Sequence, residues 1–310
     1  MSDEVSRLRA WLIATRPQTL PAGAAPVVVG IALAWDAGVF SAVPALAALV
    51  GALLIQIGTN FANDYYDAKA GVDTDDREGF TRVTQSGLLP PEQVRRATFG
   101  TFGLAFLVGI YLVWVGGLPI LVIGLASLAS GYAYAGGPYP LGSHGLGDLF
   151  VFVFFGVIAV TGTVYVQAAD VLAAPLATTV PPGTVTAEVV VASLPLAAIA
   201  TNILVVNNVR DMETDRRAGK RTLAVLIGYR WSRVEFLAMF ALAYLVPVYL
   251  WAWGFGLAVL APLATVPLAA WVSRTVLTRT DGEALNPALE RTGKLLAAYA
   301  ALFAVGIVLA

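Results

Sequence analysis

Two clusters of acidic and amide side chains each follow directly on a long apolar stretch of the chain. In the first cluster Asp64 and Asp67 are three residues apart, and in the second Asp211 and Asp215 are four residues apart. On a helix, either spacing places both carboxylates on the same face. Two such pairs facing one another would hold Mg²⁺, which in proteins bridges carboxylates to phosphate oxygens. The pattern therefore predicts a site that handles a polyphosphate at a membrane surface.

Amide side chains extend the first cluster toward the apolar stretch before it. Asn60 and Asn63 share one helical stripe with Asp64 and Asp67, and Gln56 lies further back, where lipid would otherwise be. If the helix simply ended in water, its solvated acids would explain Asp64 and Asp67, but not the amides further back in the apolar stretch. The continuation of the stripe favours a polar cavity inside a helix bundle.

Basic side chains accompany the second cluster. Asn207 lies four residues before Asp211, and Arg210 and Lys220 are close enough in sequence to grip phosphate oxygens. A cytoplasmic loop with incidental acids would explain the bases but not the repeated spacing of the acids. Because the same arrangement occurs twice on one membrane face, we favour a binding site.

A third connection, 131–148, is rich in Gly, Pro and Tyr and contains neither Lys nor Arg. The rings of Tyr132, Tyr134 and Tyr139 either line a pocket for an aromatic substrate or form an interfacial aromatic belt. His144, the only histidine, is a candidate acid, base or anion contact, although a lone histidine is more often structural.

Two arginines outside the clusters are also candidates. Arg16 precedes the first apolar stretch and either anchors the chain at the interface or binds an anion. Arg82 lies in the polar, glycine-flanked segment 79–87, which would be able to close over a site. Position in the sequence does not decide between these roles.

The elements that must position these residues are membrane-spanning helices. Of the 310 residues, 58% are hydrophobic and 13% are charged, against about 25% charged in a soluble domain. The net charge of −1 gives no electrostatic basis for binding nucleic acid, and no cysteine is present for thiol chemistry. A spanning helix needs roughly 20 mostly apolar residues. The stretches that qualify are 20–35, 42–61, 97–114, 118–134, 149–166, 189–206, 235–251, 257–272 and 294–310.

The basic residues predict the orientation of these spans. All 19 Lys and Arg lie in the N-terminal segment and in the connections after the second, sixth and eighth stretches, the last of these including Lys294 at the start of the ninth stretch. Because positive charge marks the cytoplasmic side, we expect the N terminus and the site to be cytoplasmic and the C terminus to lie outside. The expected fold is an all-α, polytopic protein of the plasma membrane, with nine transmembrane helices forming one domain over residues 1–310.

The clusters resemble the two motifs of the UbiA-type intramembrane prenyltransferases, N-D-x-x-D-x-x-x-D and D-x-x-x-D. The residues that match are Asn63, Asp64, Asp67, Asp211 and Asp215. Gly71 stands where the first motif has its last Asp, and Asp73 follows two residues later. That departure is similar to the menaquinone branch, the 1,4-dihydroxy-2-naphthoate prenyltransferases. Further segments that resemble this branch are R-P-Q-T-L-P, G-G-P-Y-P-L-G-S-H-G-L-G-D, N-N-V-R-D-M-E-T-D-R-R-A-G-K-R-T-L-A-V and L-N-P-A-L-E-R-T.

The resemblance implies a nine-helix UbiA-like bundle, open sideways to lipid and capped by cytoplasmic segments. A long-chain isoprenyl diphosphate would bind through Mg²⁺ to both Asp motifs. The aromatic acceptor, 1,4-dihydroxy-2-naphthoate, would be prenylated with loss of its carboxylate as CO₂ to give demethylmenaquinol.

Four groups of site residues are predicted. The catalytic residues are Asp64, Asp67, Asp211 and Asp215. The Mg²⁺ ligands are Asn63, Asp64, Asp67, Asp73, Asn207, Asp211 and Asp215. The diphosphate contacts are Asn60, Lys69, Arg82, Arg210 and Lys220. The acceptor contacts are Arg16, Tyr132, Tyr139 and His144.

Two alternatives remain open at this level. Within the same superfamily, the acceptor would be 4-hydroxybenzoate, homogentisate or a glycerol-phosphate lipid. In another class, the intramembrane acids would serve an ion-coupled transporter, which predicts charges near the midplane and on both sides rather than at one face. Prenyl chain length, the general base and oligomeric state leave no signal in the sequence.

Overall fold

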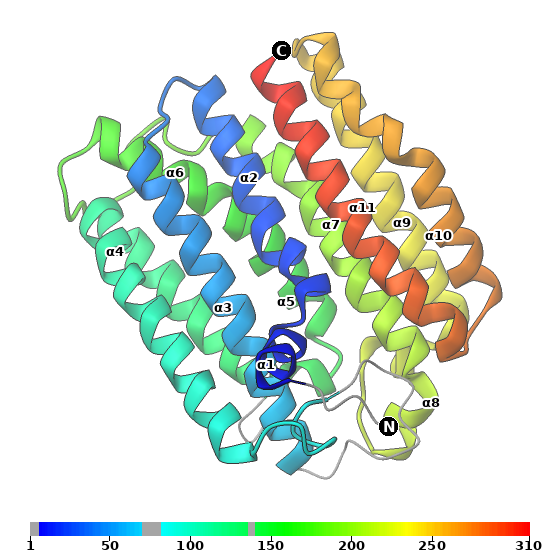
Figure 1. Ribbon diagram of the computed structural model, residues 1–310. Coiled ribbons are helices and arrows are strands. Elements are labelled where there is room, and N and C mark those ends of the chain that lie inside the picture. The colour runs from blue at the N-terminus through cyan, green and yellow to red at the C-terminus, as the bar shows by residue number, and fades with distance from the viewer. Residues whose placement is uncertain (1–5, 70–81, 136–139) are drawn as a thin grey trace.

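The computed structural model describes residues 6–69, 82–135 and 140–310, and within these ranges the chain is helical with no β-strand. Asp73 and Tyr139 lie outside the described residues. The longer helices run side by side as a bundle, with α1 and α8 at one end and the C-terminal end of α11 at the other (Figure 1). The helices are α1 (Arg7–Thr15), α2 (Leu20–Asp36), α3 (Ala42–Lys69), α4 (Pro91–Ala135), α5 (Gly147–Phe152), α6 (Ala159–Leu172), α7 (Ala187–Arg210), α8 (Met212–Arg217), α9 (Leu223–Trp253), α10 (Val266–Thr278) and α11 (Gly282–Val308).

Shorter helical pieces join several of these elements. A π-helical turn links α5 to α6, so that 147–172 forms one span. The connecting pieces are η1 (Pro17–Thr19), η2 (Leu141–Ser143), η3 (Val153–Ile158) and η4 (Leu257–Thr265).

Side-chain caps fix where several helices begin. The side-chain oxygens of Thr186, Thr222 and Asp281 each accept the backbone N–H three residues further on, at the starts of α7, α9 and α11. Such a cap satisfies one of the N–H groups that a helix start leaves without an intrahelical partner.

The described residues contain eight helices that are long and apolar enough to cross a membrane, and α4 is one of them. It contains two of the nine predicted spans, separated by Gly117, whose φ of 67° and ψ of −150° are not helical. Phe102 lies against Gly58 of α3, and Gly131 lies next to the adjacent Thr59. In a straight helix, residues 102 and 131 would be about 43 Å apart, so the chain reverses at Gly117. The reversal accounts for the difference between eight helices and nine predicted spans.

The connection before α7 holds this reversal in place. Leu118 N donates to Ala177 O (2.8 Å), and Leu176 N donates to Trp114 O (3.0 Å). A side chain at Gly117 would collide with the Ala177 backbone, so the turn depends on glycine for both its positive φ and its close approach.

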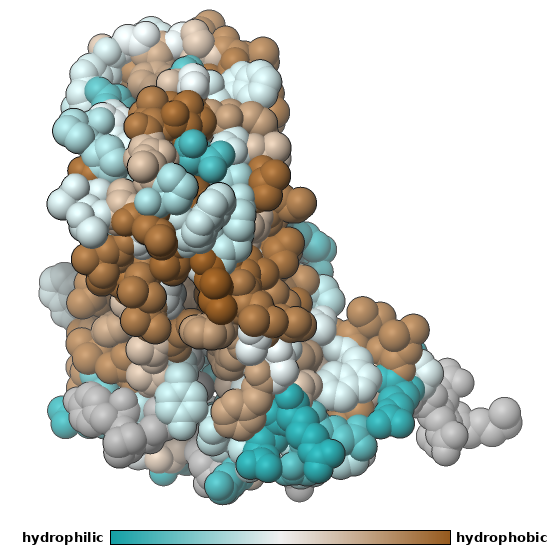
Figure 2. All heavy atoms as spheres, turned by 90° about the vertical axis from the view of Figure 1, so that its left-hand side faces the viewer, coloured by the Kyte–Doolittle hydropathy of each residue, from teal (hydrophilic) through white to brown (hydrophobic). Residues whose placement is uncertain are grey.

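The face formed largely by α4 carries the signature of a membrane protein. Figure 2 shows a broad hydrophobic band across the middle of this face and hydrophilic residues gathered toward its lower end. Leu104, Leu107 and Val122 are among the exposed apolar side chains of α4. In water such a patch would be costly, whereas in a bilayer it is the expected surface.

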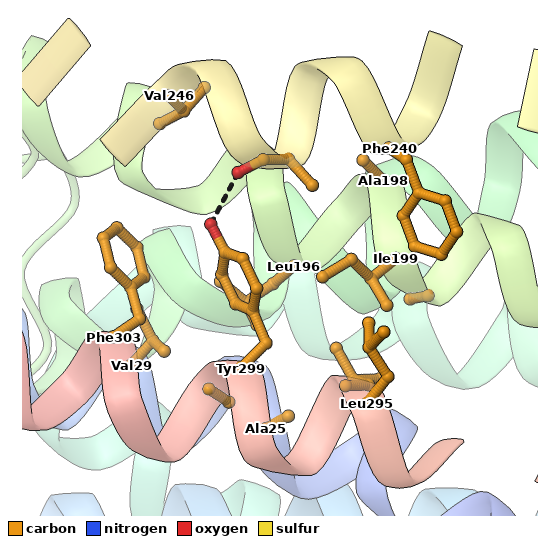
Figure 3. Close-up of a cluster of buried hydrophobic side chains, with 14 of the residues drawn as sticks. Ala25, Val29, Leu196, Ala198, Ile199, Phe240, Val246, Leu295, Tyr299 and Phe303 are labelled. Atoms are coloured by element: carbon orange, nitrogen blue, oxygen red, sulfur yellow. Dashed lines mark hydrogen bonds between the residues drawn. The ribbon is translucent and has the colours of Figure 1, made fainter. Parts of the chain in front are cut away.

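The core lies around α7, which packs against α9, α11, η3, α5 and α2. Leu196 and Ile199 of α7 are fully buried against Phe240 of α9 and Tyr299 of α11 (Figure 3). The Tyr299 hydroxyl donates to Ala243 O at 2.6 Å, which satisfies its polar end inside the apolar core. This packing gives the site a fixed wall on the α7 side.

Candidate active site

A cavity of ≈ 530 Å³ runs between α2, α3, both arms of α4, the α5–α6 span and α7. One part is polar and basic, and the rest is lined by aliphatic and aromatic side chains. The described lining residues include three arginines and neither Asp nor Glu, so the cavity suits an anionic ligand with an apolar tail. The polar lining residues are Arg16, Thr19, Gln56, Thr59, Asn60, Asn63, Arg82, Ser127, Ser130, Tyr134, Thr163, Asn207 and Arg210.

The apolar part of the cavity reaches the outer surface of α4. Phe106, Leu121 and Leu125 line the cavity, yet they are 53%, 38% and 53% exposed. Exposed side chains that also line the cavity indicate that the cavity is open along α4.

Asp64 and Asp67 of the first motif bind residues 82–84, the next residues that the structure describes after α3. Asp64 is buried, and its two carboxylate oxygens accept from the backbone N–H groups of Val83 (3.1 Å) and Thr84 (2.9 Å). Asp67, one turn further along α3, forms an ion pair with Arg82 at 2.7 Å. The motif therefore places the Arg82 guanidinium in the cavity wall.

The amides on the same face of α3 hold the segment before α2. Asn60 Nδ2 donates to Thr15 O and to Thr19 Oγ1, both at 2.9 Å. Gln56 Nε2 donates to the same Thr19 hydroxyl at 3.2 Å. These bonds fix the turn at Arg16, whose φ of 51° is left-handed and whose side chain also lines the cavity.

The second Asp motif is organised around Arg210, the last residue of α7. Its Nε and Nη2 each donate to one carboxylate oxygen of Asp211 at 2.7 Å, a two-pronged pairing. Nη2 also donates to Asn207 Oδ1 (2.7 Å), and Nη1 donates to Asn286 Oδ1 (2.8 Å). A buried guanidinium with this many partners has one orientation, and it lines the cavity.

Asp211 joins α7 to α8 with φ of −90° and ψ of 3°, so the predicted stripe crosses a junction between two helices. Asp215 N nevertheless donates to Asp211 O at 2.8 Å, which keeps the two residues one turn apart. The Lys220 ammonium lies 3.5 Å from the Asp215 carboxylate. Lys220 is thereby held next to Asp215 of the second Asp motif.

Tyr134 is a further residue whose side chain lines the cavity. Neighbours of both motifs also line the same cavity, with Asn63 from the first and Asn207 from the second. One amide side chain of each cluster therefore borders the same cavity.

The carboxylate and amide oxygens around the cavity are of the chemical type that binds Mg²⁺. Carboxylates and amide oxygens are hard ligands of the kind this ion takes, and Asp67, Asp211 and Asp215 stand with Asn63 and Asn207 at the basic end. Among the residues described, no three acidic or histidine side chains are gathered into a metal cluster. The carboxylates are paired with basic side chains or, for Asp64, with backbone N–H groups.

Several predicted contacts lie elsewhere in the described structure. Lys69 is exposed at the end of α3, and Tyr132 is 46% exposed and packs edge-on against Tyr66. His144 Nδ1 lies 2.8 Å from Pro140 O. None of Lys69, Tyr132 and His144 is among the described residues that line the cavity, so their roles stay predictions.

Four positions at the cavity are absent from the four groups of predicted site residues, although Tyr134 was considered as a ring that lines a pocket. Thr19, Thr59 and Tyr134 line the cavity, and Asn286 orients Arg210 from α11. Tyr134 lies in the Gly- and Tyr-rich connection and Asn286 in the L-N-P-A-L-E-R-T segment, so both carried a signal. Thr19 and Thr59 carried none, since isolated threonines are common in apolar helices.

The fold and the site together define a membrane-embedded protein with an intramembrane cavity for an amphiphile whose head group is anionic. The chain belongs to the UbiA prenyltransferase family, whose model matches residues 24–309.

Comparisons with individual proteins agree with this family. The chain is 36% identical to the 1,4-dihydroxy-2-naphthoate octaprenyltransferase of Escherichia coli (strain K12), over 99% of this chain and 97% of that protein. The fold is similar to the apo structure of a UbiA homolog from Aeropyrum pernix K1, with a TM-score of 0.67 and 16% identity over 92% of this chain and 97% of that one. It is also similar to a UbiA homolog from Archaeoglobus fulgidus bound to GPP and Mg²⁺, with a TM-score of 0.61 and 15% identity over 96% of this chain and all of that one (100%).

Proposed function

We propose that this protein transfers a polyprenyl group from a long-chain isoprenyl diphosphate to 1,4-dihydroxy-2-naphthoate, with loss of CO₂. The product would be demethylmenaquinol, an intermediate of menaquinone biosynthesis. The observation that carries the proposal is the cavity, which has a basic, polar part beside both Asp motifs and an apolar part that opens sideways through α4. The name of the Escherichia coli relative supports this choice of acceptor over the other acceptors and over a transporter.

The basic part would bind the diphosphate. Arg82 and Arg210 both line the cavity, and each is buried and held by partners on its own side. Pre-oriented cations stabilise a leaving diphosphate without having to reorganise during the reaction.

Mg²⁺, as in the Archaeoglobus homolog, would have Asp67, Asp211, Asp215, Asn63 and Asn207 as its oxygen ligands. When bound, the ion would neutralise negative charge on the diphosphate. Asp64, with both oxygens on backbone N–H groups, would act mainly by holding the Arg82 segment. Asp73 keeps its predicted role as a further ligand.

The apolar part would hold the prenyl tail and exclude water. In the reaction the allylic C–O bond breaks as the diphosphate leaves, and the electron-rich ring carbon that carries the carboxylate forms the new C–C bond. The bond to the carboxylate then breaks, CO₂ leaves, and its electron pair restores the aromatic ring. Water in this space would capture the allylic carbon instead, so a dry wall protects the reaction.

We also propose that the basic part of the cavity faces the cytoplasm, in the plasma membrane. The basic residues around Arg82, Arg210 and Lys220 support this orientation. The whole chain would act as one domain, since α2 near its start packs along α11 near its end (Figure 1).

The proposal is tested with purified protein in liposomes, given 1,4-dihydroxy-2-naphthoate and a series of isoprenyl diphosphates. Mass spectrometry of the lipid fraction should show one prenyl group joined to the naphthoquinol and no carboxylate. EDTA should abolish the product and Mg²⁺ restore it. A product made only from 4-hydroxybenzoate, or one that keeps the carboxylate, would refute the assignment.

A matched pair of arginine variants shows that the product comes from this site. Arg210→Gln should reduce product formation by about 10²–10³-fold, the usual cost of losing one electrostatic stabiliser. Arg216→Gln, which removes an exposed arginine paired with Glu213 on the neighbouring α8, should leave the rate unchanged.

A further inference from the structure

Gln56 and Thr59 each place in the cavity a polar atom that has no hydrogen-bond partner among the described residues. Gln56 and Thr59 line the cavity from α3 and are only 7% and 8% exposed. Gln56 Oε1 and Thr59 Oγ1 are buried, and neither has a partner. Because an unmet polar group is costly in an apolar interior, such atoms point to a ligand that supplies the missing bonds.

The hydrogen bonds around Thr19 establish which end of the Gln56 amide is unpaired. The Thr19 hydroxyl donates to Arg16 O at 3.0 Å, and a carbonyl oxygen can only accept. The Thr19 oxygen therefore accepts from Asn60 Nδ2 and from Gln56 Nε2. The amide orientation follows from this network, and it leaves Gln56 Oε1 as an acceptor that needs a donor.

The Thr59 hydroxyl is unusual among the threonines of this bundle. A threonine inside a helix commonly donates to the carbonyl four residues earlier. The threonines here that do so include Thr98, Thr101, Thr161, Thr163, Thr201, Thr275, Thr278 and Thr292. Thr59 makes no such bond, so its hydroxyl is free to donate and to accept.

The chemistry of the substrates decides which of them fits. An ionised diphosphate offers only acceptor oxygens and would meet Gln56 Oε1 unfavourably, and a prenyl tail offers no polar group. A phenolic hydroxyl offers both the donor that Gln56 needs and an oxygen for Thr59. The neighbouring residue of α4 is Gly131, where a Cβ would lie 3.4 Å from Thr59 Oγ1, so no side chain of this residue covers the Thr59 hydroxyl.

Resting on the proposed function, we propose that Gln56 and Thr59 form a subsite for one ring hydroxyl of the aromatic acceptor. The ring O–H donates to Gln56 Oε1, and the Thr59 hydroxyl donates to the ring oxygen. The two residues are one turn apart on α3, close enough for one oxygen to meet both. They are specificity-determining residues that position the ring beside the basic part of the cavity.

Thr59→Val is the sharpest test because the hydroxyl has no protein partner to lose. The variant should unfold at the same temperature as the parent or higher. Its KM for 1,4-dihydroxy-2-naphthoate should rise about tenfold, while its KM for the prenyl diphosphate stays unchanged. Gln56→Met should raise the acceptor KM by a similar factor. Thr101→Val, in α4 and outside the described lining, loses its bond to Ala97 O and should leave both KM values unchanged.

Acceptor analogues that each lack one hydroxyl, 1-hydroxy-2-naphthoate and 4-hydroxy-2-naphthoate, complete the test as competitive inhibitors. One of them should bind the parent about tenfold more weakly than the other, and Thr59→Val should erase that difference. If the parent transfers prenyl groups but Thr59→Val keeps the parental acceptor KM and analogue preference, the subsite is wrong while the proposed function stands. If the parent transfers nothing to this acceptor, the proposed function fails, and the subsite for this acceptor fails with it.

Discussion

Asp64 offers a test of whether an acid of the first motif stabilises the fold without any metal. Its carboxylate accepts from the N–H groups of Val83 and Thr84 in a buried position. Asp64→Asn keeps the shape of the side chain but leaves only one acceptor oxygen. The amide NH₂ then faces the other N–H, so one bond is lost and two donors oppose each other.

The size of the effect follows from that count. A hydrogen bond to a charged group contributes about 1.5–3 kcal/mol, and one such bond is lost. For a chain of this length, 1 kcal/mol shifts the midpoint of thermal unfolding by about 2–3 °C, so Asp64→Asn should lower it by roughly 3–9 °C. Glu290→Gln serves as the control because it breaks only an exposed pair with Lys294, which contributes about 0.5 kcal/mol or less.

The assay is thermal unfolding in detergent, followed by tryptophan fluorescence, with EDTA present so that no divalent ion contributes. The expected result is a clear drop for Asp64→Asn and almost none for Glu290→Gln. If the two variants unfold at the same temperature, the bonds from Val83 and Thr84 do not stabilise the fold and the reasoning is refuted.

Three further outcomes are expected. Asn286→Leu removes an acceptor of Arg210, so steady-state kinetics should show about a tenfold higher KM for the prenyl diphosphate and an unchanged KM for the acceptor. Gly124→Leu adds a side chain to the cavity wall, at a position where a Cβ meets nothing within 4 Å. The added side chain should lower kcat/KM more for long-chain prenyl diphosphates than for geranyl diphosphate. Equal losses for both donors would contradict the placement of the prenyl tail beside Gly124. The hydrogen bond from Arg279 is the main cause that lowers the pKa of Asp281 from 3.8 to about 2, so its carboxylate stabilises the fold above pH ~4 and this contribution is lost as the pH falls through ~2. Asp281→Asn keeps a capping oxygen and should unfold slightly below the parent at pH 7, with the difference vanishing near pH 2.

Local sequence predicted the helices well because apolar length and caps are local properties. The apolar spans and the placement of Asn60, Asn63, Asp64 and Asp67 on one helix were predictable from the sequence. The reversal inside α4 was also predictable, since two spans of ordinary length meet there at a Gly-Gly-Leu-Pro sequence.

Contacts between distant segments escaped prediction because they depend on how helices pack. Asp64 was expected to hold a metal, yet its oxygens meet the backbone of Val83 and Thr84, and no side-chain pattern announces a backbone partner. The orientation of the Gln56 amide depends on Thr19, which lies on another element. The partnership of Arg210 with Asn286 joins two helices that are remote in sequence.

The division of the cavity into a basic part and an apolar part has a consequence for how a turnover would end. Pyrophosphate dissolves only in water, and a prenylated quinol dissolves only in lipid. The lipid product would depart past Phe106 and Leu125, which border the bilayer, whereas the inorganic product would leave from the arginine side. Separate exits would let each product leave without waiting for the other, so the helices would not need to alternate between inward-open and outward-open forms.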